Sequence, residues 1–166
     1  ETPPKVTVDK TYVVKSKPKP LERLDVPRLR VLAFSALYHT EIGSPNPTRD
    51  PVLVLATVGS WGEKKTFTAQ DSDDKVLIKG FVDYVHKKDP DIIVGYGSNR
   101  NDLPYLLQRS ANLGLKLNLD RMGGEPHQSV YGHFSIVGRA NLDLLDFAED
   151  IPEVKLKTLP NIAEFL

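Results

Sequence analysis

The sequence has 166 residues, of which 40% are apolar, and its 22 basic and 22 acidic side chains give a formal net charge of zero. A chain of this length forms one globular domain by default and can bury roughly two-thirds of its unfolded surface. No cysteine is present, which excludes a disulfide framework, a zinc ribbon, an iron–sulfur cluster and a thiol nucleophile. This absence fits a reducing compartment, and we expect a cytoplasmic location.

The longest apolar run, Val52 to Val58, is interrupted by Thr57 and is much shorter than the ~20 residues of a membrane span. We therefore expect no membrane partner. Residues 1–28 are predicted to form a basic, proline-rich arm or linker, because residues 1–30 hold eight Lys or Arg against four Asp or Glu. Such an arm either contacts phosphate backbones or joins a neighbouring domain as a solvated linker.

Three strands are predicted to follow the arm in meander order. Residues 29–37 are almost continuously apolar at their centre, which is typical of a central strand buried on both faces. Residues 43–51 contain three prolines and are expected to form a loop. Residues 51–59 are predicted to form the second strand, and residues 64–69 a shorter third strand that alternates polar and apolar side chains.

Helices and strands then alternate along the chain. Apolar residues at helical spacing predict an amphipathic helix over residues 73–88, with Asp71 to Asp74 supplying its N-cap and first turn. A short strand over residues 91–96 precedes a second helix over residues 101–113, capped by Asn101 or Asp102.

The C-terminal third is predicted to contain a strand over residues 129–137. Residues 141–147 are either a strand or a strand-to-helix junction, and residues 158–166 begin a helix. This order of elements predicts an α/β domain, residues 29–166, with a mixed central β-sheet flanked by helices.

Several collinear segments carry a family resemblance. They are Val31-Leu32-Ala33-Phe34, the proline-rich loop 43–51, Asp89-Pro90-Asp91-Ile92-Ile93-Val94-Gly95-Tyr96, Asn101 to Arg109, and Gly138-Arg139-Ala140-Asn141-Leu142-Asp143-Leu144 with Thr158-Leu159. In this order and spacing they resemble the 3′-to-5′ exonuclease domain of archaeal-type family B DNA polymerases. The resemblance implies a ribonuclease H-like fold and a piece of a longer chain, truncated at its C-terminus, from which the polymerase palm is absent.

The resemblance also implies a catalytic site that is degenerate here. In the family, four acidic residues hold two divalent cations, Mg²⁺ or Mn²⁺, which activate water and stabilise the leaving oxygen. Ser35 stands at the first aspartate position and Leu37 at the glutamate position, whereas the third position keeps Asp102. No tyrosine is followed four residues later by Asp. We therefore name no confident catalytic residue and expect no bound metal or other cofactor.

Other acidic residues have structural interpretations. Asp102 is either a surviving ligand or a helix cap, and we favour the cap. Asp143 matches a family acidic position but is expected to be structural. Glu41 and Asp50 could replace the lost ligands, yet they lie in or beside the proline-rich loop, where we expect them to solvate the loop.

Four residues are candidates for nucleic-acid contact: Tyr96, Asn99, Arg100 and Tyr105. The two tyrosines could stack on a base, although packing in the core or on a helix is the favoured use. The predicted function is an exonuclease-like domain of a family B DNA polymerase homologue, inactive as a nuclease, with a structural or DNA-contacting role in replication or repair. Its expected partners are DNA, held weakly, and the remaining polymerase domains or a polymerase assembly. The alternative is an active metal-dependent exonuclease that uses replacement ligands.

Overall fold

The computed structural model describes residues 12–20, 22, 25–70 and 73–166. The first part of the predicted arm, and Asp71 and Ser72 of the predicted helix start, lie outside the described residues. The described residues of the arm, and the two residues that follow it up to Arg30, form no helix or strand. The folded body begins with β1 at Val31.

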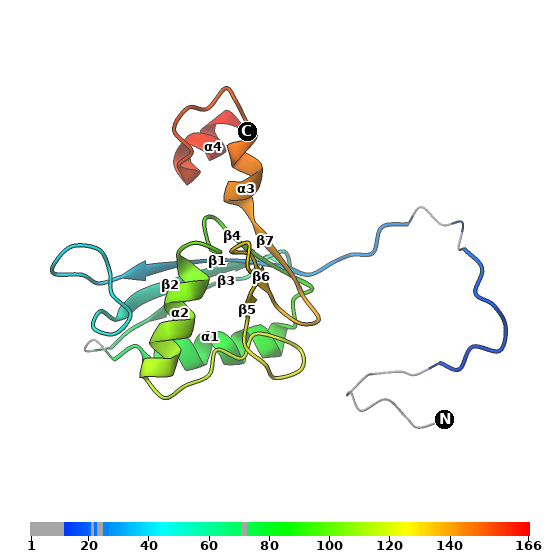
Figure 1. The fold of residues 1–166 in the computed structure, drawn as a ribbon, viewed down its shortest axis with the longest axis horizontal. Coiled ribbons are helices and arrows are strands. Elements are labelled where there is room, and N and C mark those ends of the chain that lie inside the picture. Colours follow the sequence, from blue (N-terminus) through cyan, green and yellow to red (C-terminus); the bar gives the residue numbers. More distant parts are fainter. Residues whose placement is uncertain (1–11, 21, 23–24, 71–72) are drawn as a thin grey trace.

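A mixed five-stranded sheet forms the centre of the molecule (Figure 1), in the order β3-β2-β1-β4-β7. Its strands are β1 (Val31–Tyr38), β2 (Val52–Gly59), β3 (Lys64–Thr68), β4 (Ile92–Gly95) and β7 (Ala140–Asp143). The first three pair antiparallel as a meander, whereas β4 pairs parallel to both β1 and β7. The predicted central position of the first strand is confirmed, as is the predicted mixed sheet. The expectation that this strand is buried on both faces is wrong, because Ser35 and Leu37 are exposed on one face of the sheet.

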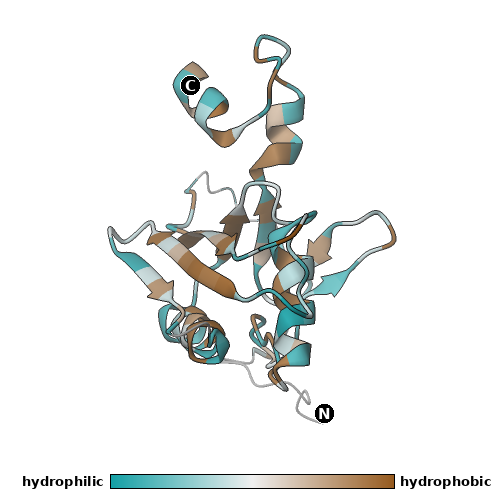
Figure 2. Cartoon of the chain, turned by 90° about the vertical axis from the view of Figure 1, so that its left-hand side faces the viewer, coloured by the Kyte–Doolittle hydropathy of each residue, from teal (hydrophilic) through white to brown (hydrophobic). Residues whose placement is uncertain are grey.

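Two helices cover one face of the sheet. They are α1 (Lys75–Lys88) and α2 (Asp102–Asn112), and in Figures 1 and 2 they lie on one side of the sheet while the C-terminal helices stand on the other. The core lies between the sheet and these two helices, where Phe81 packs against Phe34 and Phe67 with ring centroids 5.7 and 6.2 Å apart. Both helices confirm the predictions made from apolar spacing.

The predicted strand over residues 129–137 is wrong. The structure has instead a small hairpin of β5 (His127–Gln128) and β6 (Phe134–Ser135). The chain reverses between these strands at Gly132, which has a φ of 86°, and the Ser129 amide donates to the His133 carbonyl. A positive φ is not compatible with an extended strand, and glycine adopts it at little cost. The turn at Gly132 therefore divides the predicted strand into a hairpin.

The C-terminal region agrees with the remaining predictions. The strand β7 passes directly into α3 (Leu144–Glu149), which is the predicted strand-to-helix junction, and α4 (Leu159–Phe165) follows. Thr158 caps α4 through its side-chain oxygen. Within the described part of the chain, no helix is long and apolar enough to cross a membrane.

A buried ion pair joins the helix layer to the sheet. Asp74, which is 0% exposed, accepts hydrogen bonds from the Arg109 guanidinium at 2.8 and 3.0 Å. The same carboxylate accepts from the Val52 amide at 2.8 Å, and Arg109 also donates to the Pro47 carbonyl at 3.3 Å. The pair therefore connects the starts of α1 and β2, the end of α2 and the proline-rich loop. Asp74 occupies the predicted N-cap position of α1 but makes no side-chain cap hydrogen bond, and the Lys75 amide bonds to the Asp73 carboxylate instead.

We predict that Arg109→Met lowers the free energy of unfolding by about 3–5 kcal/mol, because it leaves the Asp74 carboxylate buried without its cation. Urea unfolding followed by circular dichroism measures this loss. The control is Lys79→Ala, which breaks the exposed pair between Lys79 and Asp83 and should change stability by less than about 1 kcal/mol. A loss for Arg109→Met no larger than that of the control contradicts the prediction.

Candidate functional site

The site expected from the sequence lies at the C-terminal half of β1. Ser35 and Leu37 alternate with Phe34 and Ala36, so their side chains lie on the sheet face opposite α1 and α2. Both are exposed, Leu37 to 58%. Ser35 stands opposite Ala56 of β2. The two β1 positions therefore present a hydroxyl and a hydrocarbon on a largely apolar surface.

Asp102 is the first residue of α2, and its carboxylate is almost entirely buried, with 7% of the residue exposed. It accepts a hydrogen bond of 2.5 Å from the Tyr38 hydroxyl. The expectation that Asp102 caps the helix is wrong, because α2 has no side-chain cap hydrogen bond. The helix-starting amide of Leu103 bonds to the Ser98 carbonyl instead.

The surroundings of Asp102 change its acidity. Burial raises the pKa of the Asp102 carboxyl to about 6, the hydrogen bond from Tyr38 opposes that rise, and the nearby charge of Asp143 adds to it. Burial and the Asp102 charge in turn raise the pKa of the Tyr38 hydroxyl. The hydroxyl thus stays a hydrogen-bond donor to Asp102 throughout the range in which the carboxyl titrates.

Asp143 fixes the backbone around the start of α2. Its carboxylate accepts from the Gly97 amide at 2.6 Å and from the Asn99 amide at 2.8 Å, and it caps α3 by accepting from the Leu145 amide at 3.0 Å. Gly97 has a φ of 69°, a conformation that glycine adopts at little cost. The predicted structural role of Asp143 is confirmed, and this role places the turn that carries Asp102.

Asp50 and Glu41 are the two acidic residues that were considered as replacement metal ligands. Asp50 is buried, and the Arg49 side chain, together with the Asn46 amide, lowers the pKa of Asp50 to about 2. Arg49 Nε donates to Asp50 at 2.7 Å. The expectation that Asp50 solvates the loop is therefore wrong, because this carboxylate organises the loop from inside. Glu41 is exposed.

The structure separates the candidates for nucleic-acid contact. Asn99 is buried, and its side-chain oxygen accepts from the Phe134 amide and the Asn141 side chain. Arg100 is exposed and forms an ion pair with Glu149 at 2.9 Å. The Asn99 oxygen and the Arg100 guanidinium are thus engaged in contacts within the domain.

The two tyrosines lie in different surroundings. Tyr96 donates from its hydroxyl to the Lys157 carbonyl at 2.8 Å, beside α4. Tyr105 is buried, donates to the Asp50 carbonyl at 2.7 Å, and has its ring centroid 4.0 Å from that of Tyr38. The packing use favoured for these tyrosines agrees with these contacts, while DNA contact by the four residues stays a prediction.

A hollow of about 560 Å³ borders this region. Its walls come from the end of β1, the proline-rich loop and the outer side of α2: Tyr38, Ser44, Pro45, Pro47, Arg100, Asn101, Pro104, Tyr105 and Gln108. It brings together Arg100 and Tyr105 of the predicted set and adds Tyr38, which sequence reasoning missed. The sequence signal for Tyr38 was its position next to Leu37, at the end of the central strand.

Comparison with known proteins decides the family. The family described as DNA polymerase family B, exonuclease domain, matches residues 2–159. The chain belongs to this family.

Relatives of this exonuclease domain are archaeal DNA polymerases. DNA polymerase 2 of Aeropyrum pernix is 46% identical over 138 residues, which are 83% of this chain and 17% of that protein. The DNA polymerase of Archaeoglobus fulgidus is 34% identical over 148 residues, which are 88% of this chain and 18% of that protein. The chain thus spans less than one fifth of the length of these relatives.

A solved structure supports the same assignment. The family B DNA polymerase from the hyperthermophilic archaeon Pyrobaculum calidifontis matches with a TM-score of 0.82 and 53% sequence identity, covering 84% of this chain and 18% of that chain. The predicted ribonuclease H-like exonuclease fold is confirmed. Within the described residues of this exonuclease domain, no group of three or more His, Cys, Asp or Glu side chains is placed to hold a metal ion.

We predict that Asp102→Asn removes a pH dependence of stability. The pKa of Asp102 is higher in the folded domain, about 6, than in an unfolded chain, so the folded state binds the extra proton and stability falls as pH rises from about 4 to about 6. Asparagine is neutral and still accepts from Tyr38, so the variant should be more stable than the parent at neutral pH, by up to about 3 kcal/mol. Urea unfolding across this pH range measures the difference.

The matched comparison is Tyr38→Phe, which removes the hydrogen bond that favours the ionised carboxylate. This variant should show a larger fall in stability over the same pH window, the opposite of the effect of Asp102→Asn. The prediction is contradicted if the dependence of stability on pH is the same in both variants as in the parent protein.

Proposed function

We propose that this exonuclease domain does not cut DNA and serves a structural or nucleic-acid-contacting role within a family B DNA polymerase. The observation that carries the proposal is the presence of Ser35 and Leu37 on an exposed, largely apolar face of β1, at positions where the family resemblance implies two carboxylates. Leu37 has no lone pair to offer a cation. A neutral Ser35 hydroxyl does not offset the charge of divalent ions as a carboxylate does.

The remaining donors do not fit the two divalent cations that active relatives use. Asp102 is the third position of the family site, and its buried carboxylate already accepts from Tyr38. A site for hard cations depends on several anionic oxygens to offset the dehydration of the ion. One carboxylate beside a hydroxyl and a leucine supports a domain without a catalytic metal.

The alternative function is an active exonuclease that uses replacement ligands. Of the two acids considered, Asp50 is held by Arg49 and by the Asn46 amide. Glu41 lies on an exposed loop, where a side chain is not held to the tolerance that a catalytic metal site needs. The contacts of these two acids favour the proposal over this alternative.

The proposal includes the partners of the domain. DNA would be held weakly, by cations such as Lys15, Lys17 and Lys19 of the exposed arm, since a net charge of zero gives the chain little general attraction to phosphates. The other partners are the remaining domains of a polymerase acting in replication or repair. A cytoplasmic location belongs to the same proposal.

A digestion assay tests the function. A 5′-labelled single-stranded oligonucleotide incubated with the protein and millimolar Mg²⁺ or Mn²⁺ should stay intact, because the donors needed to hold the catalytic ions are missing. Shortening of the strand that is lost in Asp102→Ala would overturn the proposal in favour of the alternative.

Restoring the lost acids provides a second prediction. The double variant Ser35→Asp, Leu37→Glu should melt at a lower temperature than the parent without metal, because its carboxylates repel one another. Millimolar Mg²⁺ should raise its melting temperature, by ~2–4 °C for each kcal/mol of binding free energy. The matched control, Ser35→Asn with Leu37→Gln, has similar side-chain shapes without the charges and should not respond to Mg²⁺. An equal response in both double variants, or in the parent protein, contradicts the prediction.

A further inference from the structure

A cluster of cationic side chains lies where the end of α1, the strand β3 and the start of β1 meet. The Arg30 guanidinium donates from Nε to the carbonyl of Lys88, the last residue of α1, at 2.9 Å. Lys65 of β3 and Lys88 both lie against the Tyr84 ring, with their Nζ atoms 5.0 and 5.6 Å from its centroid. Lys87 is exposed three residues after Tyr84, on the same side of the helix. We name this cluster, formed by Arg30, Lys65, Lys87 and Lys88, the basic corner.

Aromatic rings hold the cations of the basic corner in place. The Arg30 guanidinium lies over Trp61, 4.5 Å from the ring centroid. Gly59 packs so closely against the same indole that a Cβ on it would lie 2.2 Å from the ring. The Tyr84 ring, which supports Lys65, belongs to a residue that is only 4% exposed. Such contacts fix the cations in space, and because cations and backbone already occupy the rings, the corner offers charge without an open surface for stacking bases.

The carboxylates beside the basic corner already have partners. Glu63 pairs with Lys88. Asp89, which follows α1, pairs with Arg121 and Arg139 at 2.8 and 2.6 Å. Within the part of the chain that the structure describes, none of the other three cations of the corner has a carboxylate within ion-pair distance of its side chain. The corner therefore keeps an excess of positive charge, although the whole chain has a net charge of zero.

The basic arm joins the folded body at this corner. Arg30 immediately precedes β1, and Arg28, the last residue of the arm, lies two residues before it; both are exposed. Figure 1 shows the arm leaving the body on the side where α1 ends. Lys15, Lys17 and Lys19 are exposed along the arm. A polyanion bound at the corner therefore has a second group of cations next to it in the chain.

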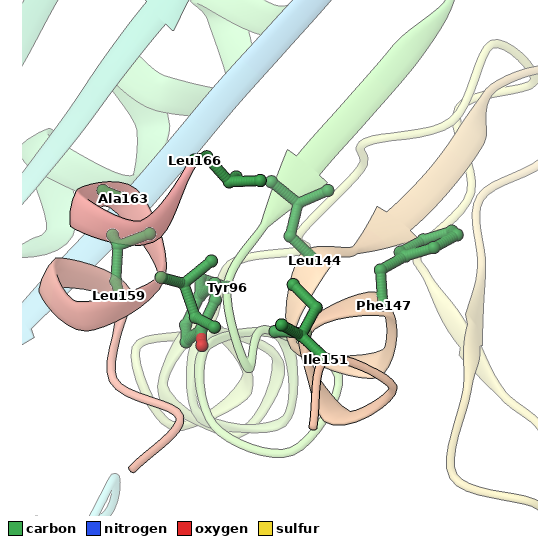
Figure 3. A pocket seen from close by; sticks show the side chains of 9 residues that line it. Tyr96, Leu144, Phe147, Ile151, Leu159, Ala163 and Leu166 are labelled. Atoms are coloured by element: carbon green, nitrogen blue, oxygen red, sulfur yellow. The ribbon is translucent and has the colours of Figure 1, made fainter. Parts of the chain in front are cut away.

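The C-terminal side of the domain does not fit a polyanion. A hollow of about 300 Å³ lies between the end of β4 and the two C-terminal helices, and apolar side chains such as Leu144, Phe147 and Ile151 line it (Figure 3). The helix α3 beside it carries the acidic side chains Asp146 and Glu149. Phosphate groups are attracted by cations and repelled by carboxylates. The distribution of charge thus favours the basic corner over this side of the domain.

We propose that the basic corner, together with the arm, binds the phosphate backbone of double-stranded DNA without reading its sequence. This inference rests on the proposed nucleic-acid-contacting role of the domain. A duplex presents one negative charge for each ~1.7 Å of its axis, whereas proteins that hold single strands also depend on open aromatic rings on which bases stack. The corner has the charge, and its rings are occupied, so the duplex is the better fit.

The basic corner is separate from the degenerate exonuclease positions. Arg30 immediately precedes β1, whereas Ser35 and Leu37 lie toward the C-terminal end of that strand. Tyr84, which supports two of the corner cations, packs in the core between α1 and the sheet. Ser35 and Leu37 are on the opposite face of the sheet. A duplex held at the corner therefore does not occupy the face on which the family site would lie.

Fluorescence anisotropy of a labelled, blunt-ended duplex, titrated with the protein in EDTA at several salt concentrations, tests the proposal. The test variant, Lys65→Gln with Lys87→Gln, removes two exposed charges of the corner and leaves the Arg30 contacts in place. The matched control, Lys75→Gln with Lys116→Gln, removes two exposed lysines outside the corner and has the same net charge. Circular dichroism confirms that both variants are folded.

The parent protein should bind the duplex more tightly than a single strand of the same length, whatever the sequence. The test variant should bind the duplex about tenfold more weakly at low salt, and the slope of log affinity against log salt should fall by about 2, because two phosphate contacts are lost. The control variant should keep the affinity and the slope of the parent.

An equal loss in the control variant overturns the proposal, because net charge alone then explains the binding. Tighter binding of the single strand, or no binding of the duplex at low salt, also overturns it. A labelled polyglutamate peptide that binds the parent more tightly than the duplex does identifies an acidic protein segment as the occupant and overturns the choice of DNA. The outcome is independent of nuclease activity: loss of duplex binding leaves the proposed absence of cleavage untouched, and cleavage in the digestion assay refutes that proposal without affecting this one.

Discussion

The buried pair of Asp74 and Arg109 is the contact on which the helix layer depends. A carboxylate with no exposed surface is tolerated only when its charge and its lone pairs are matched. Here the Arg109 guanidinium supplies the charge and two hydrogen bonds, and the Val52 amide supplies a third. Because these groups come from α1, α2 and the start of β2, the three elements hold a single relative position, and the proline-rich loop is bound to them through the Pro47 carbonyl.

Three buried carboxylates in this domain differ in their partners, and the partners decide what each one does. Asp74 has a cation and joins elements. Asp143 has three backbone amides and shapes the turn between β4 and α2 while capping α3. Asp102 accepts a hydrogen bond from the neutral Tyr38 hydroxyl and from no cation among the described residues, so burial dominates and raises its pKa to about 6. The Asp102 carboxylate is therefore the least compensated of the three.

The side chains of Ser35 and Leu37 determine both the chemistry and the packing of one face of the sheet. In an α/β domain, a sheet face that carries no helices is exposed to solvent, forms a functional site or is covered by another element. Carboxylates on β1 would make this face a metal site. A serine and a leucine place a hydroxyl and a hydrocarbon beside Val54 and Val58 on this face.

The sequence alone determined the elements and the family. The meander, the two helices of the core and the strand-to-helix junction follow from periodicities of two and 3.6 residues, which depend on near neighbours. The assignment of Ser35 and Leu37 to ligand positions of the family rests on collinear motifs and stays a prediction. The sequence did not determine the hairpin at Gly132, where one positive φ reverses a stretch that resembles a strand. It also did not determine the partners of buried polar groups: Tyr38 reaches Asp102 across 64 positions, and Arg109 reaches Asp74 across 35. Such pairs depend on how the packed elements meet in space, and only the tertiary structure decides that.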